Sequence, residues 1–510
     1  MVNGSSRPYL KGAISGVFAA LVLIASSLIV RAEFGIGTIA ELASDRIAPL
    51  TGIPLFFKLL NLLSGYSHLK QLGIVATLLL ELAGGAIVGL LYTRLQRSER
   101  RPRAMAVTSA VVAGILLLTL VGLWPNLLTN YDGLPPLTAR PASILGLFVE
   151  TALFLAALFW AGSLLRRREQ PEVERDERRR ALTFGVASAV TAAVSIGILG
   201  YFYKIASYHY DGTENVGDDL EPVTSNDDFY QVTKNNVDPR PTLDKWALEV
   251  GGDVAHPAVL RMSDLQALPS VLQETTLQCI SNEVGGGLNS NAKWKGVLLR
   301  DVIQRSGPSE GARQVMFHGA DGFSDEIPFE KAMHPQTLLA FEMNEETLPQ
   351  RHGFPVRLIV PGYVGEKSVK WLTRIDVRKV PGKGFYEQQG WGPQFTINTS
   401  SRFDSTFDDS LHVGQRVVLK GTAFAGDRGV KKVEVSTDDG NSWNPAEITY
   451  QGSDLAWVQW RFPWQPSSAG EAMLSVRCVD GLGKVQVADA SGPAPNPATG
   501  LHHLKVTVVA

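Results

Sequence analysis

Long apolar stretches with few charges fill the first 205 residues and then stop. Five of them reach the length of roughly 20 residues that a helix needs to cross a membrane: residues 12–30, 72–93, 104–124, 142–165 and 181–203. A further apolar stretch, 47–63, is broken by Pro49, Pro54 and Lys58, so we expect it to lie in the membrane interface rather than to cross. The pattern predicts an all-α membrane bundle of five helices over residues 1–205.

The remaining 305 residues have the pattern of an ordinary soluble protein. A polar, acidic stretch at 207–228 predicts an exposed linker, which we place at 206–226. Short strand and helix patterns then alternate over 227–395, which predicts an α+β domain. After a poorly patterned stretch at 396–409, period-two patterns separated by turns predict an immunoglobulin-like β-sandwich over 396–510.

The arginines of the short loops set the expected orientation of the bundle. Arg94 with residues 96–103, and residues 166–180, are rich in arginine, whereas residues 125–141 contain only Arg140. Because such loops stay in the cytoplasm, we expect the N-terminus inside and everything after Tyr203 outside. The run Arg178-Arg179-Arg180-Ala-Leu-Thr-Phe resembles a twin-arginine export signal, although an ordinary positively charged anchor is the alternative.

Two carboxylates fall inside the predicted spans. Glu81 and Glu150 each lie eight or nine residues into a helix that runs from outside to inside, so we expect them at a shared depth of roughly 13 Å. They are either functional in proton or quinone chemistry, or neutral acids hydrogen-bonded inside the bundle. His68 is the only histidine before Tyr203, which argues against a haem held by paired histidines.

Composition excludes several classes of protein and leaves one thiol of interest. A formal net charge of -2 argues against a nucleic-acid binder, and two cysteines are too few for a disulfide framework or a zinc cluster. Cys279 is followed by the flexible backbone of Gly285, Gly286 and Gly287, and its thiolate is a strong donor to a soft metal. A disulfide with Cys478 is the alternative.

Two segments carry a resemblance to a known family. Residues 276–303 contain a QCxxN sequence around Cys279 and then WxGVxLRDVI, and residues 352–377 read HGFPVRLIVPGYVGEKSVKWLTRIDV. In this order they resemble the molybdenum-cysteine and cofactor-phosphate segments of the sulfite oxidase family. The resemblance covers residues 227–510. It implies a sulfite-oxidase-type molybdopterin domain, a C-terminal dimerisation domain, and molybdenum–molybdopterin (Mo-MPT) as the cofactor.

The resemblance also implies a set of cofactor contacts, with Cys279 as the metal ligand and catalytic residue. They are Asp227, Tyr230, Gln231, Cys279, Asp321, His352, Arg357, Ser368, Val369 and Lys370. Arg357 offers a bidentate fork, Lys370 a point charge, and residues 362–365 backbone donors, all of which suit a phosphate. Taken singly, Arg357 also fits a structural ion pair and His352 a turn, and we expect Trp294 and Trp371 in the core.

The chain departs from the family where substrate would bind. At positions where sulfite oxidases place arginines around the oxo group, alignment gives Glu283, Val284 and His503, and the family's active-site tyrosine aligns with Trp391. Lys234, Lys293 and His503 are candidates to restore positive charge, but Glu283 should repel sulfite. The opening Asp-Phe-Tyr sequence at 228–230 is more similar to the periplasmic methionine-sulfoxide-reductase branch.

These observations predict a membrane-anchored molybdenum oxidoreductase on the outer face of the cytoplasmic membrane. Its expected reaction is two-electron oxygen-atom transfer on a small S- or N-oxide or oxidised methionine, with sulfite dehydrogenation as the alternative. A cofactor-less exported receptor of the same fold is an alternative of a different class. The sequence has no CxxCH site, so we expect a separate electron carrier, either a cytochrome or a quinone-linked membrane partner. The sequence alone does not decide whether the protein forms a homodimer.

Overall fold

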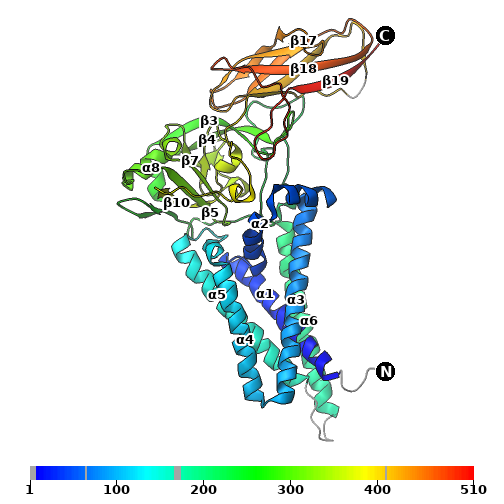
Figure 1. Ribbon diagram of the computed structural model, residues 1–510, viewed down its shortest axis with the longest axis vertical. Helices are drawn as coiled ribbons and strands as arrows, with labels where there is room; N and C mark the ends of the chain where they lie inside the picture. The colour runs from blue at the N-terminus through cyan, green and yellow to red at the C-terminus, as the bar shows by residue number, and fades with distance from the viewer. Residues whose placement is uncertain (1–6, 64–65, 166–173, 408–409) are drawn as a thin grey trace.

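Three parts follow one another along the long axis of the molecule: a helical bundle, an α+β domain and a β-sandwich (Figure 1). This computed structural model describes residues 7–63, 66–165, 174–407 and 410–510. Five helices are long and apolar enough to cross a membrane: Pro8–Phe34, Ser67–Ser98, Arg101–Gly122, Pro136–Leu164 and Arg178–His209. The prediction of five long apolar helices is confirmed for the described residues, and each helix contains its predicted apolar stretch or most of it.

Helix α1 (Arg7–Phe34) is the centre of the bundle. It packs against α3 (Tyr66–Ser98), α5 (Pro136–Leu164) and α6 (Glu174–Lys204), while α4 (Arg101–Gly122) joins from the side of α3 and α5. The backbones of α1 and α3 touch, because a Cβ on Gly16 would overlap the carbonyl oxygen of Gly85, and a Cβ on Gly89 would overlap that of Gly12. Paired glycines four residues apart on both helices permit this approach.

Helix α2 (Ile39–Leu62) is the broken apolar stretch of the sequence, and it is not among the five spanning helices. Thr38 and Glu41 form a capping box at its start. Gly52, at φ +62°, interrupts the helical backbone between Pro49 and Pro54, so the helix changes direction there. It lies at the end of the bundle nearest the α+β domain (Figure 1).

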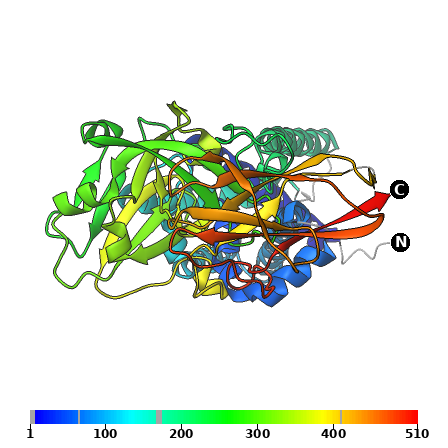
Figure 2. The ribbon, with the colours of Figure 1, turned by 90° about the horizontal axis from the view of Figure 1, so that it is seen from above.

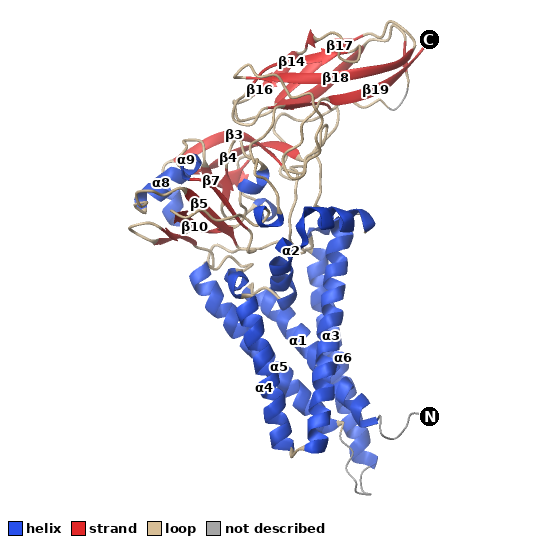
Figure 3. Ribbon diagram, viewed as in Figure 1, coloured by secondary structure: helices blue, strands red, loops and turns tan. Residues whose placement is uncertain are grey.

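The α+β domain contains two sheets with short helices at their edges (Figure 3). The first sheet has the order β2 (Ala258–Leu260), β1 (Leu248–Gly252), β10 (Leu372–Arg378), β5 (Gln314–Gly319) and β6 (Ser324–Pro328). The second has the order β3 (Ser270–Gln278), β4 (Asn289–Leu298), β7 (Leu338–Met343) and β8 (Glu346–Thr347), and β9 (Arg357–Ile359) also pairs with β7. The helices are α7 (Met262–Gln266), α8 (Leu299–Arg305) and α9 (Phe329–Ala332). Trp294 and Trp371 are buried as predicted.

The C-terminal domain is a sandwich of two sheets, which confirms its predicted class. One has the order β11 (Ser400–Phe403), β13 (Val417–Phe424), β17 (Val458–Trp464) and β16 (Glu447–Gln451). The other has the order β12 (Leu411–His412), β19 (His502–Val509), β18 (Gly470–Asp480), β14 (Val430–Ser436) and β15 (Asn444–Pro445). Seen from above, the long strands of the sandwich extend sideways from the α+β domain (Figure 2). Residues 396–409 lacked a strand pattern because β11 buries polar side chains, those of Ser401 and Arg402.

The segment 207–228 is not the exposed linker that its composition predicts. It begins with a short helical turn, η3 (Ser207–His209), and the side chains of Asn215 and Thr224 are buried. The amide of Asn215 donates to the carbonyl of Gly287 at 2.9 Å, and that of Thr224 donates to Asn291 at 2.8 Å. Two backbone amides of this segment are therefore satisfied by the region that follows Cys279, whereas several of its acidic side chains, such as those of Asp218 and Asp219, are exposed.

The glycine contact between α1 and α3 gives a first prediction. Gly85→Leu forces a side chain into the backbone of α1, so we expect the bundle to lose about 1–3 kcal/mol of stability. The measurement is the thermal midpoint of the purified protein in detergent. Gly84→Leu is the matched control, because a Cβ on Gly84 meets no other atom within 4 Å. Equal thermal midpoints for the two variants would contradict a close contact between α1 and α3 at Gly85.

Candidate cofactor site

Cys279 directly follows strand β3, at the start of a tight loop to β4. Gln278 pairs with Asn289 across the two strands, and the amide of Cys279 donates to the carbonyl of Leu288 at 2.9 Å. Within the loop, the side-chain oxygen of Asn282 accepts the amide of Leu288 at 2.8 Å. The loop is thus fixed by its own hydrogen bonds, which position the thiol.

The thiol of Cys279 is free. Its Sγ lies 3.1 Å from the hydroxyl of Ser281, and burial raises the pKa of the thiol above its usual value. Cys478 is also free, and its thiol donates to the carbonyl of Ser400 at 3.2 Å inside the sandwich. The alternative of a Cys279–Cys478 disulfide is therefore wrong. A buried neutral thiol ionises when a metal binds it, because the metal charge replaces the proton.

Two cations of this region, the buried Arg357 and the half-buried Lys370, form no ion pair with a carboxylate in the described part of the chain. Arg357 on β9 is 5% exposed; one nitrogen donates to the carbonyl of His352 at 3.2 Å, whereas its Nε has no partner. Burial lowers the pKa of Arg357 to about 10. The ammonium of Lys370 donates to the carbonyl of Arg351 at 3.4 Å and lies over the ring of Trp371, and burial lowers its pKa as well. A buried guanidinium without an ion-pair partner, such as that of Arg357, favours a bound anion.

Gln231 and Tyr230 lie in the same region. Gln231 is 3% exposed, and both polar atoms of its amide lack a hydrogen-bond partner. The ring of Tyr230 stacks on Phe229 at 5.5 Å, and its hydroxyl lies so close to Gly365 that no Cβ fits there. The side-chain oxygen of Gln278 is also buried without a partner; Gln278 is the first residue of the QCxxN sequence but was not among the predicted cofactor contacts.

Other predicted contacts build the walls of the site. His352 is 1% exposed and its Nε2 lies 2.6 Å from the carbonyl of Asn226; burial lowers the pKa of His352 to about 3, so the ring is neutral. The hydroxyl of Ser368 accepts the amide of Val360 at 3.1 Å, and Val369 lies in the core. These contacts fix the turn that precedes Lys370.

Asp321 and Asp227 differ in position. Asp321 is buried and accepts hydrogen bonds from Asn235 at 2.9 Å and from the amide of Phe323 at 3.0 Å. The side chain of Asp227 is 94% exposed and pairs with Arg351. The structure therefore brings Asp321 to the buried cluster but leaves the carboxylate of Asp227 outside it.

The donor set fits the group that the resemblance implied. Arg357 and Lys370 supply positive charge for a phosphate, the amide of Gln231 supplies a donor and an acceptor for a pterin edge, and Cys279 supplies a thiolate for a metal. The unpartnered atoms of Gln231, Arg357 and Gln278 are the structural argument, because buried polar atoms without partners are rare unless a ligand completes them.

The other face of the Cys279 loop is held by the C-terminal domain. Buried Arg402 on β11 donates to the carbonyl of Gly286 at 2.5 Å, to Asn289 at 2.7 Å and to the carbonyl of Asn215 at 2.7 Å, and it pairs with Asp404. A small cavity of about 30 Å³ lies here. Its lining includes Arg402 and the exposed Glu283 and Val284.

The expected substitutes for the family's positive charge are engaged elsewhere. Lys234 pairs with Asp45 at 2.8 Å, Lys293 lies 3.8 Å from Glu345, and the Nδ1 of His503 lies 2.7 Å from the hydroxyl of Ser475. Its neighbour His502 packs against Gly285 instead, and burial, then the charge of Arg402, lowers the pKa of His502 to about 4. The charge of Lys234 is thus compensated by Asp45, whereas a role for Lys293 or His503 toward substrate stays a prediction.

One cluster of acidic residues resembles a metal site by spacing alone. Among the described residues, Asp325, Glu326 and Glu387 bring carboxylate oxygens within 4.8 Å of one another. The ammonium of Lys367 contacts all three, at 2.7, 3.2 and 2.7 Å. Lys367 thus supplies the compensating charge. Neighbouring Glu366 has both carboxylate oxygens buried without a partner, and burial raises its pKa well above the usual value.

Comparison with known proteins gives the same two C-terminal parts. Residues 235–386 match the profile of the oxidoreductase molybdopterin binding domain, and residues 400–491 that of the Mo-co oxidoreductase dimerisation domain. Sulfite oxidase of Arabidopsis thaliana is 32% identical over 45% of this chain and 71% of its own length. The mitochondrial sulfite oxidase of Rattus norvegicus is 32% identical over 52% of this chain and 57% of its own length. The NADH nitrate reductase of Volvox carteri is 30% identical over 45% of this chain and 33% of its own length.

A solved structure shares the fold of these parts. The sulfane dehydrogenase SoxCD from Paracoccus pantotrophus superposes with a TM-score of 0.51 and 22% identity, over 57% of this chain and 82% of that chain. The chain spans between about a third and about seven-tenths of the length of the three curated relatives above.

The neutral state of buried His352 gives a second prediction. Its pKa is about 3 in the folded protein, whereas the unfolded chain takes up a proton below its usual 6.5. The contribution of neutral His352 to the free energy of unfolding is therefore fully present above pH 6.5. It falls as the pH drops toward 3, by up to about 1.4 kcal/mol per pH unit. The measurement compares melting midpoints of cofactor-free wild type and His352→Gln from pH 7.5 to 5. The wild type should lose more stability; His256→Gln, at an exposed site, should behave like wild type.

Proposed function

The chain belongs to the sulfite oxidase-like family of molybdopterin oxidoreductases, and from that premise we propose that it is a membrane-anchored enzyme of oxygen-atom transfer. Its substrate in this proposal is a small S- or N-oxide or oxidised methionine, and its site faces the outside of the cytoplasmic membrane. The observation that carries the proposal is a set of polar groups left open: the buried Arg357 and the half-buried Lys370 form no ion pair with a carboxylate in the described part, and both polar atoms of the buried Gln231 amide lack a partner.

Each of these residues has a defined task toward Mo-MPT. Cys279 would hold the metal, Arg357 and Lys370 the phosphate, and Gln231 the polar edge of the pterin. The bound group supplies the two-electron redox chemistry at an oxo position. The protein orients that group through the fixed Cys279 loop and excludes water by burying His352 and Tyr230 around it.

The charges near the Cys279 loop support a neutral substrate over sulfite. Arg402 is the one cation among the residues that line the cavity at this loop, and Asp404 pairs with it at 2.6 Å. Glu283 is exposed beside it, and His502 is neutral at physiological pH. In this proposal the substrate approaches past Glu283, whose charge repels a sulfite dianion, whereas a sulfoxide or N-oxide is not repelled.

The arrangement of the bundle supports the outward orientation. The turn between α3 and α4, with Arg97, Arg101 and Arg103, lies at the end of the bundle away from the α+β domain (Figure 1). Arg178–Arg180 of α6 lie at that end too, whereas Arg166 to Arg168 are outside the described residues. Arginines at this end favour the cytoplasm, so the α+β domain lies on the opposite side in this proposal.

Electrons reach or leave the site through a separate carrier, a cytochrome or a quinone-linked membrane protein. The sequence holds no CxxCH haem site that would do this within the chain. The match to the dimerisation domain supports a homodimer.

Turnover assays of the purified full chain test the substrate class. With a reduced viologen dye as donor, we expect reduction of methionine sulfoxide or a small N-oxide, and little oxidation of sulfite by ferricyanide. Efficient sulfite oxidation without S- or N-oxide reduction would assign the dehydrogenase alternative. Protein isolated without molybdenum and pterin from a host that makes the cofactor would favour the receptor alternative.

The third prediction concerns the phosphate contact. Arg357→Met removes a buried cation that the anion needs, so we expect molybdenum and pterin per chain to fall at least about tenfold. Metal analysis and the fluorescence of the oxidised pterin measure both. Arg305→Met, at an exposed position on α8, should keep wild-type content. Full occupancy in Arg357→Met would contradict the assigned role.

The fourth prediction concerns Glu283. Glu283→Arg replaces the repelling charge with an attracting one, so we expect the KM for sulfite to fall about tenfold while S-oxide turnover changes little. Steady-state kinetics at low salt measure this, because the effect should weaken as salt screens the charge. An unchanged KM for sulfite would show that Glu283 does not face the substrate.

A further inference from the structure

The bundle makes several of its contacts with the α+β domain at a short segment, residues 233–238, which follows the predicted cofactor residue Gln231. Lys70 of α3 donates to the carbonyls of Thr233 and Asn235, both at 2.7 Å, and pairs with Asp211 at 2.7 Å. The other oxygen of Asp211 accepts the amide of Thr233 at 3.0 Å. Two main-chain carbonyls on either side of Lys234 are thus held by one ammonium from a membrane helix.

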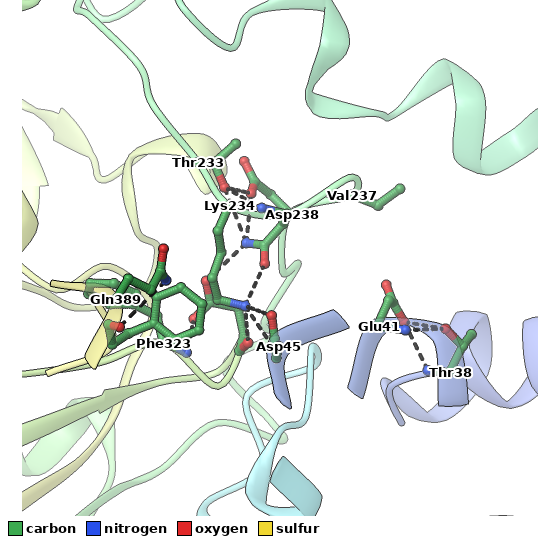
Figure 4. Close-up of polar contacts among 12 residues, drawn as sticks. Thr38, Glu41, Asp45, Thr233, Lys234, Val237, Asp238, Phe323 and Gln389 are labelled. Atoms are coloured by element: carbon green, nitrogen blue, oxygen red, sulfur yellow. Dashed lines mark hydrogen bonds and ion pairs between the residues drawn. The ribbon is translucent and has the colours of Figure 1, made fainter. Parts of the chain in front are cut away.

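A second contact starts from α2 and ends at a cofactor residue. Asp45 receives two hydrogen bonds from Lys234, each at 2.8 Å, and their side chains are 12% and 7% exposed (Figure 4). The same ammonium donates to the carbonyl of Asp321 at 2.9 Å. Burial raises the pKa of Asp45 to about 6, with Lys234 acting in the opposite direction, so the carboxyl is ionised at neutral pH.

The turn at Asp321 is enclosed by the bundle on a further side. The amide of Asn130, in the connection before α5, donates to the carbonyl of Ala320 at 3.0 Å. A Cβ on Gly322 would overlap the hydroxyl of Thr129. Asn235 in turn donates to the carboxylate of Asp321 at 2.9 Å. These contacts to the turn at Asp321 come either from the bundle itself or from residues 233–238, which the bundle holds in place.

We propose that the membrane bundle completes the cofactor pocket, with Asp45 of α2 as a positioning residue that acts through Lys234 on Asp321. This rests on the proposed function, since it assumes that Asp321 borders Mo-MPT. The bundle is then part of the binding site rather than only an anchor. A protein without the Asp45 contact should bind the same cofactor but release it faster.

The physical reason is the buried charge left behind. Removing the carboxylate of Asp45 leaves the ammonium of Lys234 buried with only carbonyl and amide acceptors, so the segment 233–238 and the turn at Asp321 must rearrange to reach solvent or another anion. Residues that orient the groups around a metal site typically change metal affinity by about 10- to 100-fold when they are replaced. Cofactor retention is therefore the sensitive readout.

The experiment uses the full chain, purified in detergent with its cofactor. Molybdenum and pterin per chain are followed during incubation of wild type, Asp45→Asn, Asp45→Glu and Asp132→Asn. Asp132 is the matched control, because it makes another ion pair between the bundle end and the α+β domain, with Lys245 at 2.6 Å, and the Lys245 ammonium otherwise donates to the carbonyl of Glu33 and not to a predicted cofactor residue. We expect Asp45→Asn to lose cofactor about 10- to 100-fold faster, Asp45→Glu to restore retention, and Asp132→Asn to resemble wild type.

A variant on the other side of the pair keeps the test decisive if Asp45→Asn folds poorly. Lys234→Gln should lose cofactor as Asp45→Asn does, and the double variant should be no worse than either single one, because both remove the same interaction. Wild-type retention in Asp45→Asn and Lys234→Gln, or equal loss in Asp132→Asn, would overturn the inference. Wild type isolated without molybdenum and pterin would instead overturn the proposed function.

Discussion

A single guanidinium, that of Arg402, holds together the three segments on which the site depends. It bonds the carbonyl of Gly286 in the Cys279 loop, the carbonyl of Asn215 in the segment that leaves the membrane, and Asn289 at the start of β4. The carboxylate of Asp404 neutralises the charge of Arg402, and both side chains are buried, so this is a buried ion pair rather than a surface one. Because Arg402 comes from the C-terminal domain, the position of the thiol depends on a domain that contributes no predicted cofactor ligand.

The sequence predicted those site residues that lie in short, recognisable segments of the chain. Cys279 and Arg357 lie in short segments whose order and spacing carry the family resemblance, and both are found in a buried region with unsatisfied polar partners. The five apolar helices and the sandwich followed from hydrophobic length and period. The division of the chain at residues 205, 226 and 395 and the individual site roles stay predictions.

The sequence was uninformative where contacts join distant segments. Arg402 lies in a stretch without strand pattern, and Asp45 lies in an apolar helix beside prolines, so neither position carries a local signal for its partner. The burial of part of the segment 207–228 could not be predicted for the same reason, because a polar segment predicts exposure unless the groups that bind it are known. Lys234 was predicted to lie near the substrate because the sequence reveals its positive charge. The sequence does not reveal that the carboxylate of Asp45 pairs with it.

Helix α1 lies between α3, α5 and α6, yet it is the first of them to leave the ribosome. Its glycine face packs on α3, whereas its other faces pack on α5 and α6, which come later in the chain. The central helix therefore has all of these neighbours only once α6 has been synthesised, and α6 is the helix that continues toward the α+β domain. A truncation that ends before α6 would leave one face of α1 uncovered as well as removing the α+β domain.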